Sequence, residues 1–460
     1  MSEVRNKIRF LGATETVTGS KYLVETPDYK LLVDCGLFQG YKSLRLRNWE
    51  EFPFDPAELD AIVLTHAHLD HSGLIPAIVR QGFRGKIYMT AGTLELCKIL
   101  WADSAKIYAE DAERANRKRY TKHEPAKPLF ELADVESALS LAQVVEFNQE
   151  LTLAKEITVT FRHAGHILGA AQVVLSVNKK KIHFTGDLGR AKDPLMLGPA
   201  AFEGADILVT ESTYGGSNHA ASDPEQELEE ILNKVLKRGG TVVIPAFAVG
   251  RTQSLMLHIW RLIKKGKLPK VTMYLNSPMA TSVSSLYHQH KEEHRIDLEE
   301  FDEMYSAARI IRDVSESKAL NESEEAKIII AASGMMEGGR VLHHVARFGP
   351  DSRNAILFSG YQAGGTRGRK LLDGDKSVRI FHADVPIRAE IFFMDTMSAH
   401  MDSNELIEWL GACKTKPTMT YVTHGEPDSA DRMRFRITDE LGWTARAATY
   451  GEVIDIDNPK

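Results

Sequence analysis

The stretch Leu64-Thr65-His66-Ala67-His68-Leu69-Asp70-His71 places four potential metal ligands within six positions, directly after the apolar run 61–64. An apolar run of this length predicts a short buried strand, so the ligands are expected on the loop that leaves its C-terminal end. A loop held between this strand and a helix predicted over 72–80 is a rigid support for chemistry. Imidazole and carboxylate ligands suit Zn²⁺ and also Mn²⁺. A solvated histidine-rich turn is the alternative interpretation, and the spacing favours a metal site over it.

The composition bounds the class of protein. At 460 residues, with 43% hydrophobic and 26% charged residues, the chain is expected to be an ordinary globular protein of two domains. No apolar stretch approaches the length of a membrane span, and residues 1–7 precede no apolar signal core. Three widely spaced cysteines fit a reducing compartment. The net charge of −6 argues against a protein that coats nucleic acid. We therefore expect a cytoplasmic protein without a membrane partner.

Acidic residues follow several predicted strands. Strands are expected over 8–11, 21–25 and 30–33, and the last of them ends at Asp34. Further along, Asp187 and Glu211 each end an apolar run in the same way. Because α/β folds place functional groups at the carboxyl ends of strands, these ends and the histidine loop are expected to share one edge of one sheet. A single Asp at such a place is as readily explained as a turn cap.

Regular helix and strand alternation predicts a second α/β domain with a parallel sheet over about 222–370. Its apolar strands, expected over 241–244, 271–275, 326–331 and 354–358, run into polar turns rich in small residues. Exposed backbone N–H groups at such turns can hold phosphates, although glycines also serve ordinary tight turns. The candidate phosphate-binding residues are Arg251, Ser277, Ser333, Gly334, Gly360, Gly365 and Thr366.

Histidines occur at three other turns. Residues 161–169 contain His163 and His166 at a glycine-rich turn, while His400 and His424 lie near the C-terminus, each after a predicted strand. A single histidine in such a place is more often structural than functional. These histidines indicate a function only in combination with the other motifs of the chain.

Taken in order, these residues resemble the metallo-β-lactamase superfamily, and in particular its β-CASP branch of nucleic-acid-processing nucleases. The likeness covers nearly the whole chain and is greatest to the RNA-specific members, which include the cleavage and polyadenylation endonuclease and its prokaryotic relatives. The residues that carry it are Asp34, the His66-x-His68-x-Asp70-His71 loop, His166 in G-H-I-L-G-A, Asp187, Glu211 in E-S-T-Y-G, His400 in S-A-H-M-D and His424 in H-G-E.

The resemblance implies an α/β fold, namely an αββα metallo-β-lactamase sandwich with an inserted α/β β-CASP domain that contains a mainly parallel sheet. The expected boundaries are 1–207 for the first part of the metallo-β-lactamase domain, 208–386 for the β-CASP domain and 387–460 for the C-terminal part. Because the chain begins almost at its first predicted strand, selectivity for RNA is expected to come from partner proteins or from the cleft itself.

The resemblance also implies roles for the residues. His66, His68 and His166 would hold one zinc ion, and Asp70, His71 and His424 would hold a second, with Asp187 between them. His163 is the substitute for His166. Asp34 would orient a ligand. His400 would assist the departing alkoxide, and Glu211 would orient His400. Two neighbouring metal ions lower the pKa of a water and hold the attacking and leaving oxygens in line, so Asp187 and Asp70 serve catalysis as well as metal binding.

The implied function is a zinc-dependent ribonuclease that hydrolyses RNA phosphodiester bonds in RNA processing or degradation, with Mn²⁺ as an alternative metal. A DNA nuclease of the same branch is the nearest rival, although His424 favours the RNA-specific members. A thioesterase or lactonase would have no need of the inserted domain, His400 or Glu211. A non-catalytic scaffold would be expected to lack ligands that are all present here. RNA is the expected partner, and the resemblance is compatible with a homodimer and with RNA-processing partner proteins.

Overall fold

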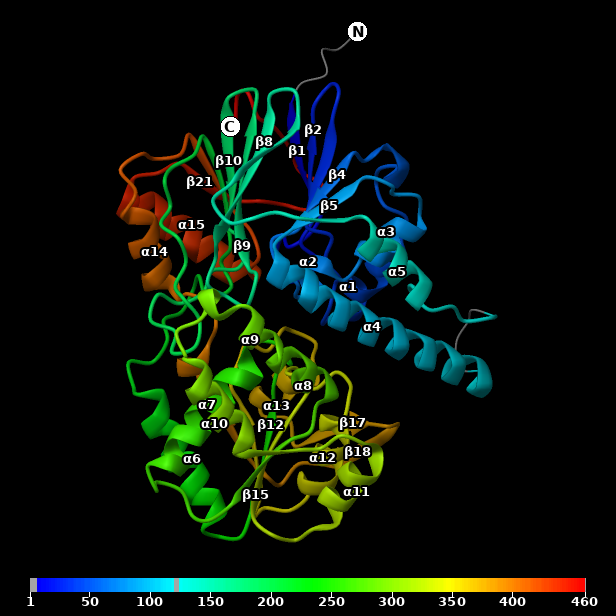
Figure 1. The fold of residues 1–460 in the computed structure, drawn as a ribbon, viewed down its shortest axis with the longest axis vertical. Helices are drawn as coiled ribbons and strands as arrows, with labels where there is room; N and C mark the ends of the chain where they lie inside the picture. The colour runs from blue at the N-terminus through cyan, green and yellow to red at the C-terminus, as the bar shows by residue number, and fades with distance from the viewer. Residues whose placement is uncertain (1–5, 120–123, 460) are drawn as a thin grey trace. The chain divides into compact units, whose positions relative to one another are not determined.

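A computed structural model of the chain describes residues 6–119 and 124–459. They divide into two compact units. The first, which we call the sandwich unit, comprises Met1–Lys192, Gly198–Asn218 and His400–Lys460. The second, the parallel-sheet unit, comprises Asp193–Leu197 and His219–Ala399. Each unit has its own sheets and apolar core, and Figure 1 shows the strands and helices of both.

The sandwich unit contains two sheets of seven strands each. The first sheet has the order β22-β1-β2-β3-β4-β5-β6. Its strands are β1 (Lys7–Phe10), β2 (Tyr22–Glu25), β3 (Lys30–Val33), β4 (Ala61–Val63), β5 (Lys86–Met89), β6 (Ala142–Val144) and β22 (Val453–Asp455). The second has the order β21-β20-β11-β10-β9-β8-β7. Its strands are β7 (Glu150–Ala154), β8 (Ile157–His163), β9 (Ala171–Val177), β10 (Lys180–Phe184), β11 (Ile207–Thr210), β20 (Met419–Val422) and β21 (Ala445–Ala447).

Both sheets change from antiparallel to parallel pairing near their middle. In the first sheet, β22, β1, β2 and β3 pair antiparallel, whereas β3, β4, β5 and β6 pair parallel. In the second, β7 to β10 pair antiparallel, and β10, β11, β20 and β21 pair parallel. Parallel neighbours bring their carboxyl ends to one edge of a sheet, which is where α/β folds place ligands.

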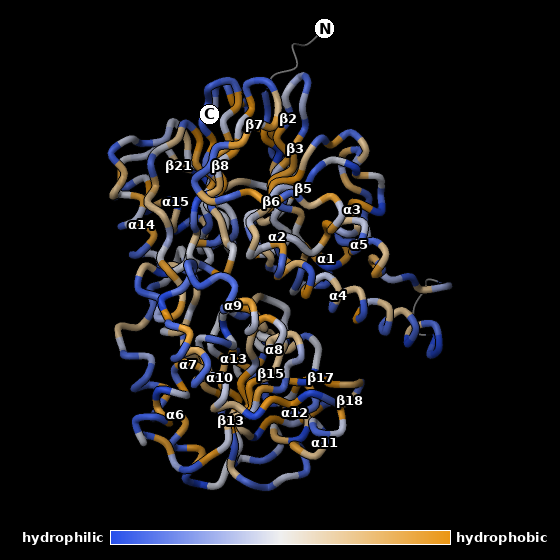
Figure 2. The backbone as a smooth tube through the Cα atoms, viewed as in Figure 1, coloured by the Kyte–Doolittle hydropathy of each residue, from blue (hydrophilic) through white to orange (hydrophobic). Residues whose placement is uncertain are grey.

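The core of this unit consists of apolar side chains from both sheets. Phe10 and Tyr421 lie with ring centroids 5.3 Å apart, and Tyr22 and Phe184 lie 5.5 Å apart, so rings from the first sheet meet rings from the second. Valine and isoleucine fill the space between them, as expected for residues that favour strands. Figure 2 shows the strands of both sheets largely in the hydrophobic colour. Each large side chain buried in this way contributes about 1.5–3 kcal/mol.

Helices cover the outer faces. On the side of the first sheet and in its connections lie α1 (Lys42–Leu46), η1 (Arg47–Trp49), η2 (Pro56–Glu58), α2 (Leu69–Ser72), α3 (Ile75–Arg80), α4 (Ala91–Lys118) and α5 (Leu132–Ser140). On the side of the second sheet lie α14 (Ser403–Gly411) and α15 (Pro427–Leu441). The sequence predicts one long helix over 93–120, and α4 confirms it as far as Lys118, while Tyr120 lies outside the described residues.

The parallel-sheet unit has six parallel strands in the order β14-β13-β15-β12-β16-β19. They are β12 (Thr241–Pro245), β13 (Thr272–Leu275), β14 (Ala308–Ile310), β15 (Lys327–Ala331), β16 (Ala355–Phe358) and β19 (Glu390–Phe393). A hairpin joins β17 (Ser377–Ile380) to β18 (Ala383–Pro386). Its helices are α6 (Pro224–Leu236), α7 (Arg251–Lys264), α8 (Pro278–Ser284), α9 (Leu286–Gln289), η3 (Lys291–Glu293), α10 (Leu298–Ser306), α11 (Val314–Glu322), α12 (Val341–Phe348), α13 (Arg367–Leu372) and η4 (Asp395–Met397). The predicted parallel sheet is confirmed.

The two compact units divide at Asn218 and Ala399, whereas the domain boundaries expected from the sequence, at 207 and 386, stay a prediction. Strand β11 hydrogen-bonds to β10 and β20, so residues 208–218 lie with the sandwich unit. Strand β19 pairs with β16, so residues 387–399 lie with the parallel sheet. Strand pairing between segments distant in sequence therefore sets both boundaries.

The strand ends that carry acidic residues differ from expectation in one respect. Asp34 and the histidine loop follow β3 and β4 of the first sheet, whereas Asp187 and Glu211 follow β10 and β11 of the second. The prediction of a single sheet is wrong, because a sandwich divides the strands between two sheets. His400 also lacks the predicted strand before it, since η4 precedes it.

Candidate metal centre

The histidine loop is held rigidly where it leaves β4. Strand β4 is buried along its length, and the N–H of Leu64 donates to the carbonyl of Tyr88. His68 is the residue that precedes α2, so Asp70 and His71 lie in the first turn of that helix. The Ser72 hydroxyl donates to the Ala67 carbonyl at 2.8 Å and accepts from the indole N–H of Trp101 at 3.1 Å. The predicted strand before the ligands is confirmed, whereas the expected loop and helix differ: Asp70 and His71 already lie in α2, and the helix predicted over 72–80 is divided, because residues 73–74 separate α2 from α3.

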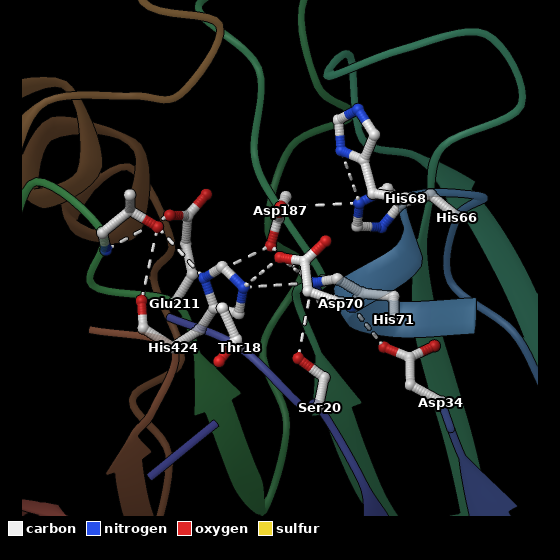
Figure 3. A network of polar contacts seen from close by, with 12 residues as sticks. Thr18, Ser20, Asp34, His66, His68, Asp70, His71, Asp187, Glu211 and His424 are labelled. Carbon is white, nitrogen blue, oxygen red and sulfur yellow. Dashed lines mark hydrogen bonds and ion pairs between the residues drawn. The ribbon is translucent and has the colours of Figure 1, made fainter. Parts of the chain in front are cut away.

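The structure gathers all seven predicted ligands into two sets of donor atoms. The first set is His66, His68, His166 and Asp187, and the second is Asp70, His71, Asp187 and His424. Within each set the donor atoms lie within 4.8 Å of one another. Figure 3 shows Asp187 among His66, His71 and His424. Asp187 is the member that the two sets share.

In the first set, three ring nitrogens converge. Nδ1 of His68 lies 3.2 Å from Nε2 of His66 and 3.1 Å from Nε2 of His166. Oδ2 of Asp187 lies 3.4 Å from Nε2 of His66 and 3.6 Å from Nε2 of His166. His163 is not a member of this set, because it ends β8 with its Nδ1 3.3 Å from the carbonyl of Gly198.

The second set is built around His71. Its Nε2 lies 3.1 Å from Nε2 of His424 and 3.2 Å from Oδ1 of Asp187. Oδ2 of Asp70 lies 3.4 Å from Nε2 of His424. Asp187 therefore presents Oδ2 to the first set and Oδ1 to the second.

Hydrogen bonds at the opposite ring nitrogens fix the orientation of three imidazoles. Nδ1 of His71 lies 2.7 Å from Oδ2 of Asp34. Nδ1 of His424 lies 3.1 Å from the Thr213 hydroxyl, and Nδ1 of His66 lies 3.1 Å from the Thr65 hydroxyl. In each case Nε2 is left to face the donor set. Such outer partners normally set the tautomer and the orientation of metal-binding histidines.

Asp34 anchors Thr65 as well as His71. Its Oδ1 accepts from the Thr65 N–H at 2.8 Å, and its Oδ2 accepts from the Thr65 hydroxyl at 2.9 Å. The backbone of Asp34 is left-handed, with φ of 59°, and that of His424 is left-handed with φ of 49°. Non-glycine residues rarely adopt this conformation, and it concentrates at functional sites.

Sequence reasoning identified Asp34 but missed Thr65 and Thr213. Both stand inside recognised motifs, Thr65 immediately before His66 and Thr213 within E-S-T-Y-G. Their place beside a ligand in the motif was the available signal.

Burial and charge set the protonation of the centre. Burial lowers the pKa of His66 to about 3 and that of His68 to about 4, and it holds the pKa of His166 well below its ordinary value. Burial alone would raise the pKa of Asp187, but His424, His71 and His66 hold it well below its usual range. Neutral imidazole and ionised carboxylate are the forms that bind metal, and the first set has them. In the second set, burial would lower the pKa of His71, but the carboxylates of Asp187 and Asp34 raise it well above its ordinary value.

These donors fit a metal ion. Zinc bound tetrahedrally at about 2.0–2.1 Å from each donor would hold the donors roughly 3.3 Å apart. The four donor separations given above for the first set, 3.1 to 3.6 Å, agree with that spacing. Converging imidazoles cannot all satisfy one another by hydrogen bonds, since a neutral ring has one N–H donor. Nitrogen and carboxylate donors suit Zn²⁺ and Mn²⁺.

His400 and Glu211 form a buried pair beside the first set. Nδ1 of His400 lies 3.2 Å from both carboxylate oxygens of Glu211, and its ring centroid lies 4.5 Å from that of His166. Glu211 is itself fixed, because its Oε1 accepts from the N–H of Leu188 at 2.6 Å. Burial lowers the pKa of His400, but Glu211, together with the charges of Asp187 and Asp70, raises it, and the net shift is upward. Asp187, Glu211 and His400 also form a third set that could hold an ion, so geometry leaves two roles for His400.

The seven candidate phosphate-binding residues lie in the parallel-sheet unit. They are on turns that follow β12, β13, β15 and β16, whose carboxyl ends share one edge of the sheet. Gln362 joins two of these turns, since its amide donates to the carbonyls of Gly334 and Gly360 at 3.1 Å each. The Arg251 side chain lies against Gly360. The hydroxyls of Ser277 and Thr366 cap α8 and α13, respectively. Phosphate binding by these residues stays a prediction.

Comparison with known proteins agrees with this geometry. Residues 16–246 match the model of the metallo-beta-lactamase superfamily, residues 252–371 match the Beta-Casp domain, and residues 384–448 match the Zn-dependent metallo-hydrolase RNA specificity domain. The chain therefore belongs to the metallo-β-lactamase superfamily and to its β-CASP branch.

Three relatives show how far the similarity extends. Ribonuclease TTHA0252 of Thermus thermophilus is 35% identical over 91% of this chain and 92% of its own length. An RNase J-like protein of Methanocaldococcus jannaschii is 32% identical over 91% of this chain and 92% of its own length. Transcription termination factor FttA of Methanosarcina mazei is 29% identical over 97% of this chain and 71% of its own length. A crystal structure of a protein of unknown function from Enterococcus faecalis shares the fold, with a TM-score of 0.51, 12% identity and coverage of 98% of this chain and 99% of that one.

Proposed function

We propose that this protein is a ribonuclease that hydrolyses RNA phosphodiester bonds with two zinc ions. The observation that carries the proposal is the pair of donor sets that share Asp187, with the His400–Glu211 pair beside them. The ribonuclease among its relatives and the match to an RNA specificity domain support RNA as the substrate.

The first ion would be held by His66, His68 and His166, and the second by Asp70, His71 and His424, with Asp187 contributing one oxygen to each. When bound, two such ions activate a water for attack on phosphorus and stabilise negative charge on the phosphate oxygens. Asp34, Thr65 and Thr213 orient the imidazoles, and the ionised Asp187 supplies negative charge between the two sites.

The departing alkoxide of a phosphodiester is a strong base and leaves more readily when it receives a proton or a hydrogen bond. His400 would supply it through Nε2, because Nδ1 is directed at Glu211. Glu211 positions the ring and favours its protonated form, as the raised pKa of His400 indicates. The upward shift keeps a larger fraction of His400 able to donate at neutral pH.

The turns of the parallel-sheet unit would bind phosphates that flank the scissile bond, through backbone N–H groups and Arg251. A cytoplasmic location belongs to the same proposal, and it is supported by three cysteines that form no disulfide. None of the helices in the described part of the chain is long and apolar enough to cross a bilayer.

A competition between RNA and DNA oligomers of one sequence tests the substrate. RNA should be cleaved, and DNA of the same sequence should be cleaved far more slowly because it lacks the 2′-hydroxyl. Equal cleavage of both would replace this proposal with a general nuclease. A time course on 5′-labelled and 3′-labelled RNA of equal length then separates internal cleavage from cleavage at an end.

A further inference from the structure

A short helical segment of the sandwich unit buries none of its own side chains. Helix α1 and the 3-10 turn η1 follow the loop after β3, and neither contains a buried residue. Their sequence, with the residue before them, is Tyr41-Lys42-Ser43-Leu44-Arg45-Leu46-Arg47-Asn48-Trp49. Trp49 is 60% exposed, Tyr41 57% and Leu46 54%. An apolar helix face is normally buried, so this segment presents its large side chains to the outside.

The segment is nevertheless fixed in place. The side-chain carbonyl of Asn48 accepts from the N–H of Phe38 at 2.8 Å, and its amide donates to the Phe38 carbonyl at 2.8 Å. The guanidinium of Arg47 lies 4.3 Å from the ring centroid of Tyr450, which is 43% exposed, and 5.5 Å from that of buried Phe38. The aromatic side chains are therefore presented on an anchored backbone.

The cations of this segment have no acidic partners. Within the ranges 6–119 and 124–459, no carboxylate forms an ion pair with Lys42, Arg45 or Arg47. By contrast, exposed Arg432 on α15 of the same unit pairs with Asp428 at 2.9 Å, and half-buried Arg434 pairs with Asp431 at 2.8 Å. In a chain of net charge −6, three unpaired cations among exposed aromatic rings form a distinct local feature.

We infer that Tyr41, Lys42, Arg45, Leu46, Arg47, Trp49 and Tyr450, which we call the aromatic–basic surface, bind the single-stranded RNA that flanks the scissile bond. Unpaired cations attract phosphates, and exposed rings stack on unpaired bases, which is how proteins hold single strands without reading their sequence. An apolar protein partner would leave three charges unpaired on burial, which is costly. The inference rests on the proposed ribonuclease function.

Backbone hydrogen bonds connect this surface to the metal centre within the one unit. The N–H of Leu37 donates to the carbonyl of Leu69 at 2.7 Å, next to Asp70. The N–H of Gln39 donates to the Thr18 hydroxyl at 3.2 Å, and two residues after Thr18 the hydroxyl of Ser20 lies 3.4 Å from Nε2 of His71 (Figure 3). Tyr41 follows Phe38 by three residues, so their Cα atoms are at most about 11 Å apart. RNA held at the donor sets therefore needs only a few further nucleotides to reach the aromatic–basic surface.

The test compares cleavage of a 5-nucleotide and a 25-nucleotide RNA by the zinc-loaded protein. In the double variant Tyr41→Ala/Trp49→Ala, kcat/KM for the long RNA should fall about tenfold or more, because each stacked base is worth about 1–3 kcal/mol. The loss should lie in KM, with kcat and the cleavage of the short RNA unchanged. In Lys42→Ala/Arg45→Ala, the slope of log KM against log salt for the long RNA should decrease by about 2.

The matched control is Phe435→Ala/Arg434→Ala on α15, which packs against β20 and β21 of the other sheet. Phe435 is 60% exposed, as Trp49 is, and Arg434 is ion-paired. This control should cleave both RNAs as the wild type does. In addition, polyuridine should quench the fluorescence of the wild type and not that of Trp49→Phe, since stacking on Trp49 is the source of the quenching.

Equal kinetics of Tyr41→Ala/Trp49→Ala and the wild type on the long RNA would overturn the inference. So would a variant that differs from the wild type in oligomeric state, because the surface would then be an interface between copies of this chain. Cleavage of the short RNA by the wild type separates the two proposals. If the wild type cleaves the short RNA, the proposed ribonuclease function is supported whatever the result with the long RNA. If the wild type cleaves neither RNA, the proposed ribonuclease function is refuted.

Discussion

Oδ2 of Asp34 lies 2.7 Å from Nδ1 of His71, and this contact joins the end of β3 to the ligand loop after β4. The same carboxylate holds both the N–H and the hydroxyl of Thr65. One buried side chain thus positions ligands of both donor sets, since Thr65 also contacts His66.

The first prediction concerns that contact. Asp34→Asn should weaken zinc binding about 10- to 100-fold, the usual effect of losing an outer partner of a ligand. Asparagine tolerates the left-handed backbone of this position, so the fold should survive. Chelator competition measures the affinity. Asp60→Asn is the control, because Asp60 lies immediately before β4, at the opposite end of that strand from the ligands, and its Oδ2 accepts from the N–H of Lys30 at 2.7 Å. An unchanged affinity in Asp34→Asn would mean that His71 is oriented without Asp34.

The second prediction concerns the residue shared by both donor sets. The purified protein should contain close to two zinc equivalents, and Asp187→Asn should lose metal from both sites together with cleavage. A neutral amide cannot supply the charge that Asp187 places 3.2 Å from His71 and 3.4 Å from His66. Elemental analysis gives the metal content.

His163→Gln is the matched control for Asp187→Asn. His163 ends β8 near the same turn but belongs to neither set, so this variant should keep both ions and full activity. Active wild-type protein with one ion or none would contradict the two-metal assignment.

The third prediction concerns stability at acid pH. His258, whose Nδ1 lies 3.5 Å from Oε1 of Glu225, and then Lys265 lower the pKa of Glu225 from 4.5 to about 2 despite partial burial. Because its folded pKa lies below its unfolded pKa, Glu225 stabilises the protein above about pH 4.5, and this contribution is lost as the pH falls toward 2. Solvent screening reduces the effect to about 1 kcal/mol.

Thermal unfolding of Glu225→Gln and wild type at pH 7 and pH 3 measures this contribution. The variant should unfold at a lower temperature at pH 7, and the gap should narrow at pH 3. Glu229→Gln, on the same helix and with a looser 3.7 Å pair to Lys267, should show little difference at either pH. A gap of equal size at both pH values would show that the ion pair does not stabilise the fold.

Much of the metal centre could be predicted because its motifs are short and continuous in sequence. The spacing of the ligands between His66 and His71 is visible in the sequence, and the apolar run before them predicts that they follow a strand. The rest depends on contacts that no local pattern contains. His71 and His424 are 353 positions apart, yet their Nε2 atoms lie 3.1 Å from each other. The resemblance to a family supplied that pairing, and the residues alone did not.

The missed features have physical causes. Strands β6, β14 and β19 have only three or four residues, too few to show a periodicity. The boundary at Asn218 follows from the pairing of β11 with β20, a contact across about 210 residues of sequence. Thr213 contacts His424 only because that pairing brings E-S-T-Y-G beside the H-G-E turn. Local propensity therefore predicted the elements better than the boundaries between units.

The last prediction concerns His400, for which geometry permits two roles. If His400 is a metal ligand, His400→Ala should reduce the zinc content. If His400 donates to the leaving group, His400→Ala should keep both ions and bind RNA nearly as well as the wild type. It should then cleave about 10²–10⁴-fold more slowly, the usual contribution of general acid catalysis. Glu211→Gln should show a smaller loss in the same direction, because it disturbs the orientation of the ring and leaves the acid in place.

RNA with sulfur in place of the departing bridging oxygen distinguishes the role of His400 from any effect on folding. A thiolate is a weak base and leaves without protonation, so the defect of His400→Ala should largely disappear on this substrate. The defect of Asp187→Asn should persist there, because activation of the attacking water is still required. A defect in His400→Ala that is undiminished on the sulfur substrate, with both ions retained, would show that His400 acts on something other than the leaving group.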